Sequence, residues 1–313
     1  MITLMVLNRR VYVYILTMFV IVLIALAYYK YTRPKPSNVS QQAFMGPFIE
    51  VRYPGKVRTG IDLDNDGSYE YIIDINPWNI RSASGSAVMR FYLGPKVFVY
   101  EQNLEDIKLK DGYVHGYPEI YYGNKPWGGN RALDGPVPLP ERVENLNDFY
   151  VILNYTIEHD PTLPINLAVE SWFTSEKFRT TGVYIGEIEM MIWFYYSSLN
   201  PAGSKVDEIV VPIVINGKTV NAKFEVYLTK MSNKWTYVAF KLTKPIREGY
   251  VKFNYAPFIR KLKDLVPPEH LSSLYLEDIE VGTEYGAPYV TRARFKWIIY
   301  EFKLEYTDKK LLE

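Results

Sequence analysis

Most of the chain is patterned for β-strands, and the stretch from Tyr184 to Tyr196 shows this pattern most strongly. Its side chains are largely aromatic, aliphatic or β-branched, which is typical of a strand. Side chains alternate between the two faces of a strand. One face is therefore predicted to enter the core, with Ile188, Met190, Ile192, Phe194 and Tyr196. The opposite face is predicted to line a cleft, with Glu187, Glu189, Met191, Trp193 and Tyr195.

Carboxylates beside large aromatic and sulfur-containing side chains are unusual on the exposed face of a strand, which normally carries Lys, Thr and Ser. The combination favours a cleft that grips a flat ligand, such as a pyranose sugar, and performs acid or nucleophile chemistry on it. An ordinary solvated strand face with two glutamates is the alternative, and this stretch alone leaves it open.

Short strands separated by turn residues continue on both sides of this stretch. The turns include Gly94-Pro95, Asp111-Gly112 and Asn216-Gly217. A strand expected from Pro164 to Thr174 again places a carboxylate, Glu170, on the same face as an aromatic ring, Trp172. One short helix is expected from Pro257 to Leu265, ended by Pro267-Pro268. Many strands, one short helix and no alternation of strands with helices predict an all-β jelly-roll sandwich of two antiparallel sheets with a concave substrate cleft.

The first part of the chain is patterned for targeting. Val11 to Tyr29 contain no charged residue, and these nineteen residues would span about 28 Å as a helix, enough to cross the hydrocarbon core of a membrane. Ala25-Leu26-Ala27 resembles a signal-peptide cleavage site, so a cleaved signal peptide and an uncleaved anchor both stay open. We predict a signal peptide or N-terminal membrane anchor at 1–31, a linker at 32–45 and a jelly-roll catalytic domain at 46–313. The catalytic domain is expected to be extracellular, either secreted or anchored to the outer face of the cell membrane.

Composition and charge exclude several kinds of chemistry. The 36 Lys and Arg residues balance 35 Asp and Glu residues, so no basic surface points to nucleic acid. The chain has no cysteine, which excludes a cysteine nucleophile. Its three histidines, His115, His159 and His270, lack metal-ligand spacing, and no serine-hydrolase motif accompanies them. Carboxylates are therefore the chemistry that the chain offers.

An acidic loop lies ahead of most of the strands. Three aspartates at alternate positions are followed by a glycine: Asp62, Asp64, Asp66 and Gly67. Three carboxylates in this spacing can converge on one cation while the glycine makes a sharp turn. The twelfth position of the EF-hand pattern is Ile73 instead of glutamate, and Glu70 or Asp74 is the candidate to complete the shell. We predict a structural calcium ion here, with an acidic turn between strands as the alternative, and no cofactor for catalysis.

Two short motifs carry the candidate catalytic carboxylates. Glu189-Met190-Met191-Ile192-Trp193 resembles the Glu-x-Met-Ile-Trp nucleophile strand of glycoside hydrolase family 12, the small jelly-roll endoglucanases. Gly282-Thr283-Glu284-Tyr285-Gly286 resembles the second catalytic motif of that family, Gly-x-Glu near the C-terminus.

Three further segments agree with this resemblance in chain order. Asn76-Pro77-Trp78 is similar to the family's Asn-x-Trp, which stacks a sugar on the non-reducing side of the cut. The segment 117–121 is similar to the family's Tyr-Pro-x-Ile-Tyr. Ala168-Val169-Glu170 falls where the family has a third acidic residue, usually Asp, on the strand facing the nucleophile. The resemblance covers roughly residues 60–306.

Two features resemble the archaeal, heat-stable branch of the family, namely the acidic loop and Lys125-Pro126-Trp127. Glutamine occurs only at 41, 42 and 102, and sparse glutamine with no cysteine is typical of a thermophilic protein.

The resemblance implies retaining hydrolysis of internal β-1,4-glucosidic bonds in cellulose or related β-glucans. Glu189 would attack the anomeric carbon. Glu284 would protonate the leaving oxygen and then deprotonate the incoming water, with about 5–5.5 Å between the two carboxyls. Glu170 would hydrogen-bond Glu189 and tune it, and Met191 and Trp193 would wall the cleft.

The resemblance also implies substrate contacts at Asn76, Trp78 and Tyr117. Glu187 shares the predicted cleft face and is interpreted as a substrate-polar or surface residue. The expected partner is a β-glucan, with membrane contact through residues 11–29 if this segment is not cleaved, and the catalytic domain is expected to be monomeric. The alternative is a non-catalytic cell-surface glycan-binding jelly roll, which the aromatic residues alone would serve. The presence of both glutamates, each in its own motif, favours the enzyme, and a membrane-anchored sensor or adhesin rests only on residues 11–29.

Overall fold

The computed structural model describes residues 44, 46–231 and 234–312. The predicted export segment, 1–31, and the predicted linker, 32–45, lie outside the described residues except for Phe44. Gly46–Glu313 cluster as one compact unit. Within the described part of the chain, no helix has the length and apolar character needed to cross a membrane.

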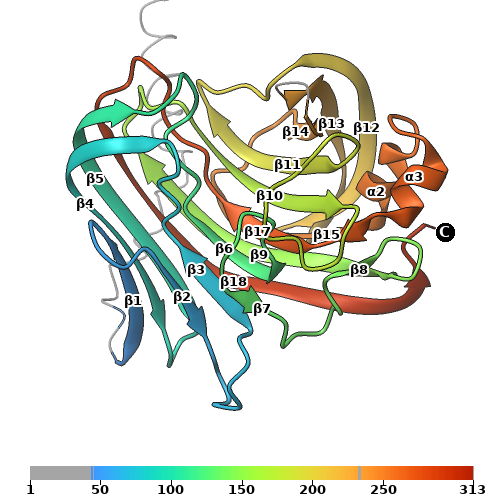
Figure 1. Ribbon diagram of the computed structural model, residues 1–313, viewed down its shortest axis with the longest axis horizontal. Coiled ribbons are helices and arrows are strands. Elements are labelled where there is room, and N and C mark those ends of the chain that lie inside the picture. The colour runs from blue at the N-terminus through green and yellow to red at the C-terminus, as the bar shows by residue number, and fades with distance from the viewer. Residues whose placement is uncertain (1–43, 45, 232–233, 313) are drawn as a thin grey trace, which may run out of the picture. The chain divides into compact units, whose positions relative to one another are not determined.

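Two layers of strands enclose the core of this unit (Figure 1). The outer layer follows the hydrogen-bonded order β1 (Phe48–Tyr53), β4 (Ile80–Tyr92), β5 (Val97–Leu109), β18 (Ala293–Lys310), β9 (Asn147–His159) and β15 (Glu248–Asn254). The inner layer follows the order β14 (Thr236–Leu242), β11 (Ile188–Ser197), β10 (Ile165–Thr174), β17 (Asp278–Gly282), β6 (Glu119–Asn124), β3 (Tyr71–Asp74) and β2 (Arg58–Ile61). Three short strands pair beside the inner layer: β7 (Arg131–Ala132), β8 (Glu141–Arg142) and β16 (Tyr275–Leu276).

A long hairpin connects the two layers. Its strands are β12 (Ser204–Ile215) and β13 (Lys218–Lys230), which pair with each other along most of their length. β13 continues into the inner layer by pairing with β14, whereas the end of β12 pairs with β15 of the outer layer. The predicted turn lies at the tip, where Asn216 and Gly217 both have positive φ, 48° and 80°, as a two-residue hairpin turn requires.

The predicted all-β jelly-roll fold is confirmed, with two differences in detail. The layers are not two separate antiparallel sheets, because the β12–β13 hairpin joins them by hydrogen bonds. Among the described strands, β11 and β14 also run parallel to each other, whereas the other pairs are antiparallel. A parallel neighbour requires a crossover connection, and the hairpin supplies it.

The described residues contain two short helices where one was predicted, α2 (Ala256–Leu262) and α3 (Pro268–Ser273). α2 corresponds to the helix expected from Pro257 to Leu265, and its buried side is formed by Ala256, Phe258, Ile259 and Leu262. Pro267-Pro268 were expected only to end a helix, but Pro268 begins α3. Proline is tolerated at the first helical position because the N–H that it lacks would have no intrahelical partner there.

The predicted alternation along β11 is correct up to Phe194 and reversed after it. Leu167 of β10 lies opposite Tyr195, but the next residue, Ala168, lies opposite Trp193, so Phe194 is an extra residue in β11. Such a β-bulge shifts the facing of the residues beyond it. Tyr195 consequently belongs to the main core, and Tyr196 packs against the small cluster on the cleft side.

The strands that carry the site are buried on both faces. All ten residues of β10 are buried, because one side packs in the core and the other supports the acidic site described below. The core between the layers contains several fully buried aromatic side chains: Tyr100, Phe149, Tyr155, Phe194 and Trp297. Burial of this apolar surface is the main force that holds the curved inner layer against the outer one.

Candidate active site

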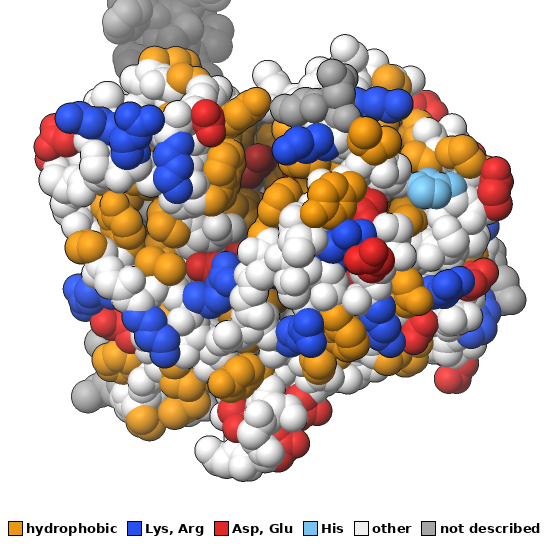
Figure 2. Space-filling model, viewed as in Figure 1, with side chains coloured by type: hydrophobic (Ala, Val, Ile, Leu, Met, Phe, Trp, Pro, Cys, Tyr) orange, Lys and Arg blue, Asp and Glu red, His pale blue; other side chains and the backbone are white. Residues whose placement is uncertain are grey.

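A row of acidic side chains crosses the exposed side of the inner layer. Residues that alternate along a strand share one face, and the pairing register aligns these faces on β6, β17, β10 and β11. The buried acids on this face are Glu119, Glu170, Glu189, Asp278 and Glu280. Figure 2 shows a hollow on this view of the molecule, bordered by hydrophobic side chains and with acidic side chains inside it.

Glu189 lies on β11 and is 8% exposed. Its Oε2 atom accepts a hydrogen bond of 2.5 Å from the indole Nε1 of Trp235. Burial raises the pKa of Glu189 to about 8, the charges of Glu284 and Glu280 act in the same direction, and the Trp235 hydrogen bond and the charge of Lys125 oppose it.

Glu284 follows the end of β17 and is held by one buried side chain, Asn166 of β10. The Asn166 Nδ2 donates to Glu284 Oε2 at 2.7 Å, and the Glu284 backbone N–H donates to Asn166 Oδ1 at 2.7 Å. A third hydrogen bond, of 3.0 Å, runs from the Asn166 backbone N–H to the Glu284 carbonyl. Burial raises the pKa of Glu284 to about 7, and the Asn166 bond opposes this.

Glu284 also acts on Glu189 through its charge. The charge of Glu284 raises the pKa of Glu189 because two carboxylates in a poorly solvated site repel each other. Of the two carboxyls, Glu189 has the higher pKa, about 8 against about 7 for Glu284.

Glu170 occupies the predicted face of β10 but not the predicted hydrogen bond. In register it lies opposite Met191 and Glu280, whereas Glu189 lies opposite Trp172, two positions further along β10. Among the described residues, no hydrogen bond joins Glu170 to Glu189. Their interaction is electrostatic: burial, Glu280 and then Glu189 raise the pKa of Glu170 well above its usual value.

A buried lysine sits among these acids. The Lys125 Nζ donates to Glu119 Oε2 and to Glu280 Oε2, both at 2.6 Å, and Lys125 is 5% exposed. Burial alone would lower the pKa of Lys125, but the two carboxylates raise it well above its usual value. The sequence placed Lys125 only in a loop motif, and its role as the cation of the acidic row was missed.

The predicted substrate residues Asn76 and Trp78 lie next to this row. The Asn76 Nδ2 donates to Glu119 Oε1 at 3.0 Å, so this amide is already engaged with the acidic cluster. Trp78 is 43% exposed, and its ring centroid lies 6.4 Å from that of the exposed Tyr113. Asn79 is fully buried and bonds to the backbone of the 111–114 loop, which fixes Tyr113 beside Trp78.

Met191, Trp193 and Tyr117 form a small apolar cluster on the cleft side of the inner layer. Met191 and Trp193 are only 1% exposed, and the Trp193 Nε1 donates to Met191 Sδ at 3.5 Å. They lie on the predicted face, but they support the floor of the cleft instead of forming open walls. Tyr117 is 4% exposed and its hydroxyl reaches the Ala168 carbonyl at 3.5 Å, so it also belongs to the floor.

Glu187 is neither a surface residue nor a substrate contact in this structure. It precedes β11 and is 1% exposed. Its carboxylate accepts hydrogen bonds from the Ser175 N–H and hydroxyl, the Tyr184 N–H and Arg179 Nη2. Glu187 therefore anchors the 175–184 loop, because its carboxylate satisfies donors that the loop would otherwise leave unpaired.

Three tryptophans from distant segments meet beside Glu189. Trp127, Trp172 and Trp235 contact one another edge to face, with ring centroids 5.5, 5.8 and 5.9 Å apart. Trp127 is 45% exposed. Trp235 was not among the predicted site residues, and its bond to Glu189 was not foreseen.

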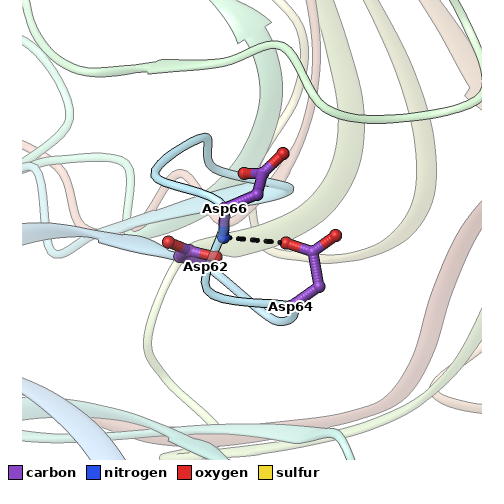
Figure 3. Close-up of side chains that lie close together, drawn as sticks. All are labelled: Asp62, Asp64 and Asp66. Atoms are coloured by element: carbon purple, nitrogen blue, oxygen red, sulfur yellow. Dashed lines mark hydrogen bonds between the residues drawn. The ribbon is translucent and has the colours of Figure 1, made fainter.

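The acidic loop brings its three aspartates together, as Figure 3 shows. Carboxylate oxygens of Asp62, Asp64 and Asp66 all lie within 4.8 Å of one another. The same oxygens also accept backbone N–H bonds within the loop, at 2.7 Å from Asn65 and 3.2 Å from Asp66, which is typical of an acidic turn. This geometry suits a cation with oxygen ligands and is equally consistent with the turn.

Of the two residues expected to complete a calcium shell, only Glu70 lies near the loop. Glu70 forms a second acidic group with Asp64 and Asp134. Asp74 is instead buried and accepts a bond of 2.6 Å from Arg58 Nε. Another hollow, of about 790 Å³, lies beside α2 and is lined by none of the acidic residues of the cleft.

The sequence profile of the family described as Glycosyl hydrolase family 12 matches residues 69–303. No match is found among curated proteins. A native family 12 xyloglucanase from Bacillus licheniformis is 17% identical, with 83% of this chain and 100% of that chain covered and a TM-score of 0.62. Endoglucanase cel12A from Rhodothermus marinus is 23% identical, with 83% and 99% covered and a TM-score of 0.58. Endoglucanase 3 from Trichoderma harzianum is 14% identical, with 84% and 99% covered and a TM-score of 0.61.

Proposed function

Because the chain belongs to glycosyl hydrolase family 12, we propose that it cleaves internal β-1,4-glucosidic bonds of a β-glucan with retention of anomeric configuration. The observation that carries this proposal is the pair Glu189 and Glu284. Both carboxyls lie on the cleft side of the inner layer, in separate motifs, and each is held by its own side-chain donor. A glycan-binding module has no need of such a pair.

In this proposal Glu189 is the nucleophile and Glu284 the acid and base. Glu189 attacks the anomeric carbon as the glycosidic bond breaks, and Glu284 gives its proton to the leaving oxygen. Water then attacks the glycosyl-enzyme ester, loses a proton to Glu284 and releases Glu189 as a carboxylate. The reaction requires an ionised Glu189 and a protonated Glu284. Burial raises the pKa of Glu189 further than that of Glu284, to about 8 against about 7, so the division of roles rests on the two motifs and not on these pKa values.

The surrounding groups support this division of roles. Lys125 offsets the negative charge of Glu280, which limits the repulsion that Glu189 meets when it ionises. Glu170, whose pKa is raised by burial and by Glu280, is expected to stay protonated and to add no charge. The exposed rings of Trp78, Tyr113 and Trp127 supply flat apolar surfaces along the cleft, which suit stacking against pyranose rings.

Two further proposals concern stability and location. The acidic loop of Asp62, Asp64 and Asp66 binds a structural calcium ion, as its converging oxygens support. The low content of glutamine and the absence of cysteine support a heat-stable protein. The catalytic unit acts on its polysaccharide outside the cell, and residues 11–29 serve as its export signal or anchor.

The direct test is hydrolysis of a soluble mixed-linkage β-glucan and of carboxymethylcellulose by the purified full chain. We expect new reducing ends and a rapid fall in viscosity, since internal cleavage shortens the polymer quickly. NMR of the first product should show the β-anomer before the α-anomer. Binding of the glucan without any reducing sugar would support the glycan-binding alternative instead.

A further inference from the structure

The indole N–H of Trp235 reaches Glu189 from the neighbouring strand. Trp235 lies immediately before β14, which runs parallel to β11 with Tyr237 opposite Glu189. The Trp235 backbone is tied on both sides: its carbonyl accepts from the Met231 N–H at 3.0 Å, and the next residue, Thr236, donates to the Glu187 carbonyl at 2.9 Å. The Nε1–Oε2 distance to Glu189 is 2.5 Å, so the indole donates directly to this carboxyl.

The tryptophan cluster fixes the direction of this N–H. Trp235 meets Trp127 at an interplanar angle of 68° and Trp172 at 67°, and these two rings meet each other at 83°. Gly182 packs against Trp127 so closely that an added Cβ would lie 2.8 Å from the ring. Rotation of Trp235 would therefore disturb both of its neighbours, and its N–H stays aimed at the carboxylate.

The same cluster contains a second indole N–H with a different environment. The Trp172 Nε1 is buried and has no hydrogen-bond partner among the described residues. Trp172 lies directly opposite Glu189 in register, yet its N–H does not serve the carboxylate. The two tryptophans therefore belong to the same ring cluster, but only Trp235 donates a hydrogen bond to Glu189.

The Trp235 bond distinguishes the two oxygens of Glu189. Oε2 is held by the indole, whereas among the described residues no hydrogen bond engages Oε1. We propose that Trp235 is a positioning residue for the nucleophile: its N–H holds Oε2, leaves Oε1 to attack the anomeric carbon, and stabilises the carboxylate that leaves when water cleaves the ester. This inference rests on the proposed function.

The chemical balance follows from this arrangement. In the first step the Oε1–carbon bond forms as the glycosidic carbon–oxygen bond breaks, and the proton of Glu284 goes to the leaving oxygen. In the second step a water oxygen bonds to the carbon, its proton returns to Glu284, and the ester electron pair returns to Glu189. Negative charge disappears from Glu189 in the first step and reappears in the second, where the indole donor favours it.

The charge state of Glu189 depends on groups from every element around it. The groups that face it are Glu284 after β17, Glu280 of β17, Glu170 of β10, Lys125 after β6, and Tyr237 of β14. The neighbouring acids disfavour ionisation, and Lys125 and Trp235 favour it. Removing the Trp235 donor should therefore raise the pKa of Glu189 and move the pH profile to higher pH.

The test compares Trp235→Phe with Trp172→Phe in the full chain. Trp235→Phe keeps an aromatic ring and deletes the donor. We expect kcat to fall about tenfold and one limb of the kcat/KM profile to move up by about one pH unit. Trp172→Phe deletes an N–H without a partner, so both limbs of its pH profile should stay at the wild-type pH, even if its kcat changes. Unchanged limbs in Trp235→Phe, or an equal move in both variants, would overturn the inference.

Two controls separate this inference from the proposed function. Glu189→Ala is assayed in parallel: full activity there refutes the nucleophile itself, whereas an inactive Glu189→Ala with a normal Trp235→Phe refutes only the role of Trp235. If Trp235→Phe does not fold, ¹H–¹⁵N NMR of the wild-type indole groups decides. The Trp235 N–H resonance should lie downfield and shift when a fluorinated glycoside traps Glu189 as an ester, and an unshifted resonance would refute the bond.

Discussion

Glu170 and Glu280 lie directly opposite each other on β10 and β17, and both are buried. Carboxylates in such a cross-strand pair are too close for both to ionise cheaply. Lys125 resolves the conflict by bonding only one of them: burial would raise the pKa of Glu280, but Lys125 brings it below its usual value. The pKa of Glu170 is correspondingly raised, so Glu170 is the member of the pair that stays protonated.

This arrangement predicts that stability falls as the pH rises from about 4.5 to about 8. Burial raises the pKa of Glu277 to about 7, of Glu284 to about 7 and of Glu189 to about 8, and it also raises those of Glu119 and Asp278. The folded chain then binds more protons than the unfolded chain in this window, so its free energy of unfolding declines with pH. Calorimetry should give a Tm several degrees higher at pH 5 than at pH 8.

Glu170→Gln provides a matched variant, because glutamine imitates the protonated acid. It should flatten this pH dependence and raise the Tm at pH 8, while Glu158→Gln on the exposed part of β9 should leave the curve unchanged. A Tm that increases steadily from pH 5 to pH 8 in the wild-type chain would contradict the buried neutral acids.

The two catalytic roles can be separated with an external anion. Glu189→Ala and Glu284→Ala should each lower glucan hydrolysis ~10³-fold or more. With a substrate that carries a good leaving group, azide should rescue both variants: an α-glycosyl azide from Glu189→Ala, where azide replaces the nucleophile, and a β-glycosyl azide from Glu284→Ala. Circular dichroism checks that both variants fold, and full activity in either one would refute the assignment.

Asn166→Ala should move the pH profile to higher pH. The Asn166 donor stabilises the charged form of Glu284, so its loss raises the pKa of Glu284 and moves one limb of kcat/KM to higher pH. Loss of the Asn166 hydrogen bonds also frees the carboxyl to rotate, and we expect kcat to fall about tenfold. A pH profile identical to that of the wild-type chain would contradict this role of Asn166.

Calcium binding to the acidic loop can be tested by chelation. If Asp62, Asp64 and Asp66 hold the ion, EDTA should lower the Tm of the wild-type chain by several degrees, because a ligand that binds only the folded state stabilises it. Asp64→Asn should have a lower Tm in calcium buffer and lose its response to EDTA. An unchanged wild-type Tm in EDTA would leave the loop as an acidic turn held by its own backbone bonds.

The strand that carries Glu189 could be predicted from the sequence, because the local alternation of side chains determines which of them share a face. The same rule failed at Tyr195 and Tyr196, since the bulge at Phe194 depends on how β10 pairs with β11 and leaves no mark in the alternation. Helix α3 was missed for a similar reason: two prolines read as a stop, although the second can also begin a helix.

The partners of the catalytic candidates were not predictable from local pattern. Asn166 lies 118 positions from Glu284, Lys125 lies 155 positions from Glu280, and Trp235 lies 46 positions from Glu189. Such contacts are created by the strand order, and no spacing within a motif reports them. The expected bond from Glu170 to Glu189 is not formed among the described residues, where register places Glu170 opposite Met191 and Glu280.

The parallel pairing of β11 with β14 has a consequence for how the enzyme is made. These strands are joined through the intervening β12–β13 hairpin, and such long-range closure is slow compared with local hairpin formation. Glu189 has its Trp235 donor only when β14 is docked beside β11. Recovery of activity during refolding should therefore report this docking, which the mere appearance of β-sheet does not.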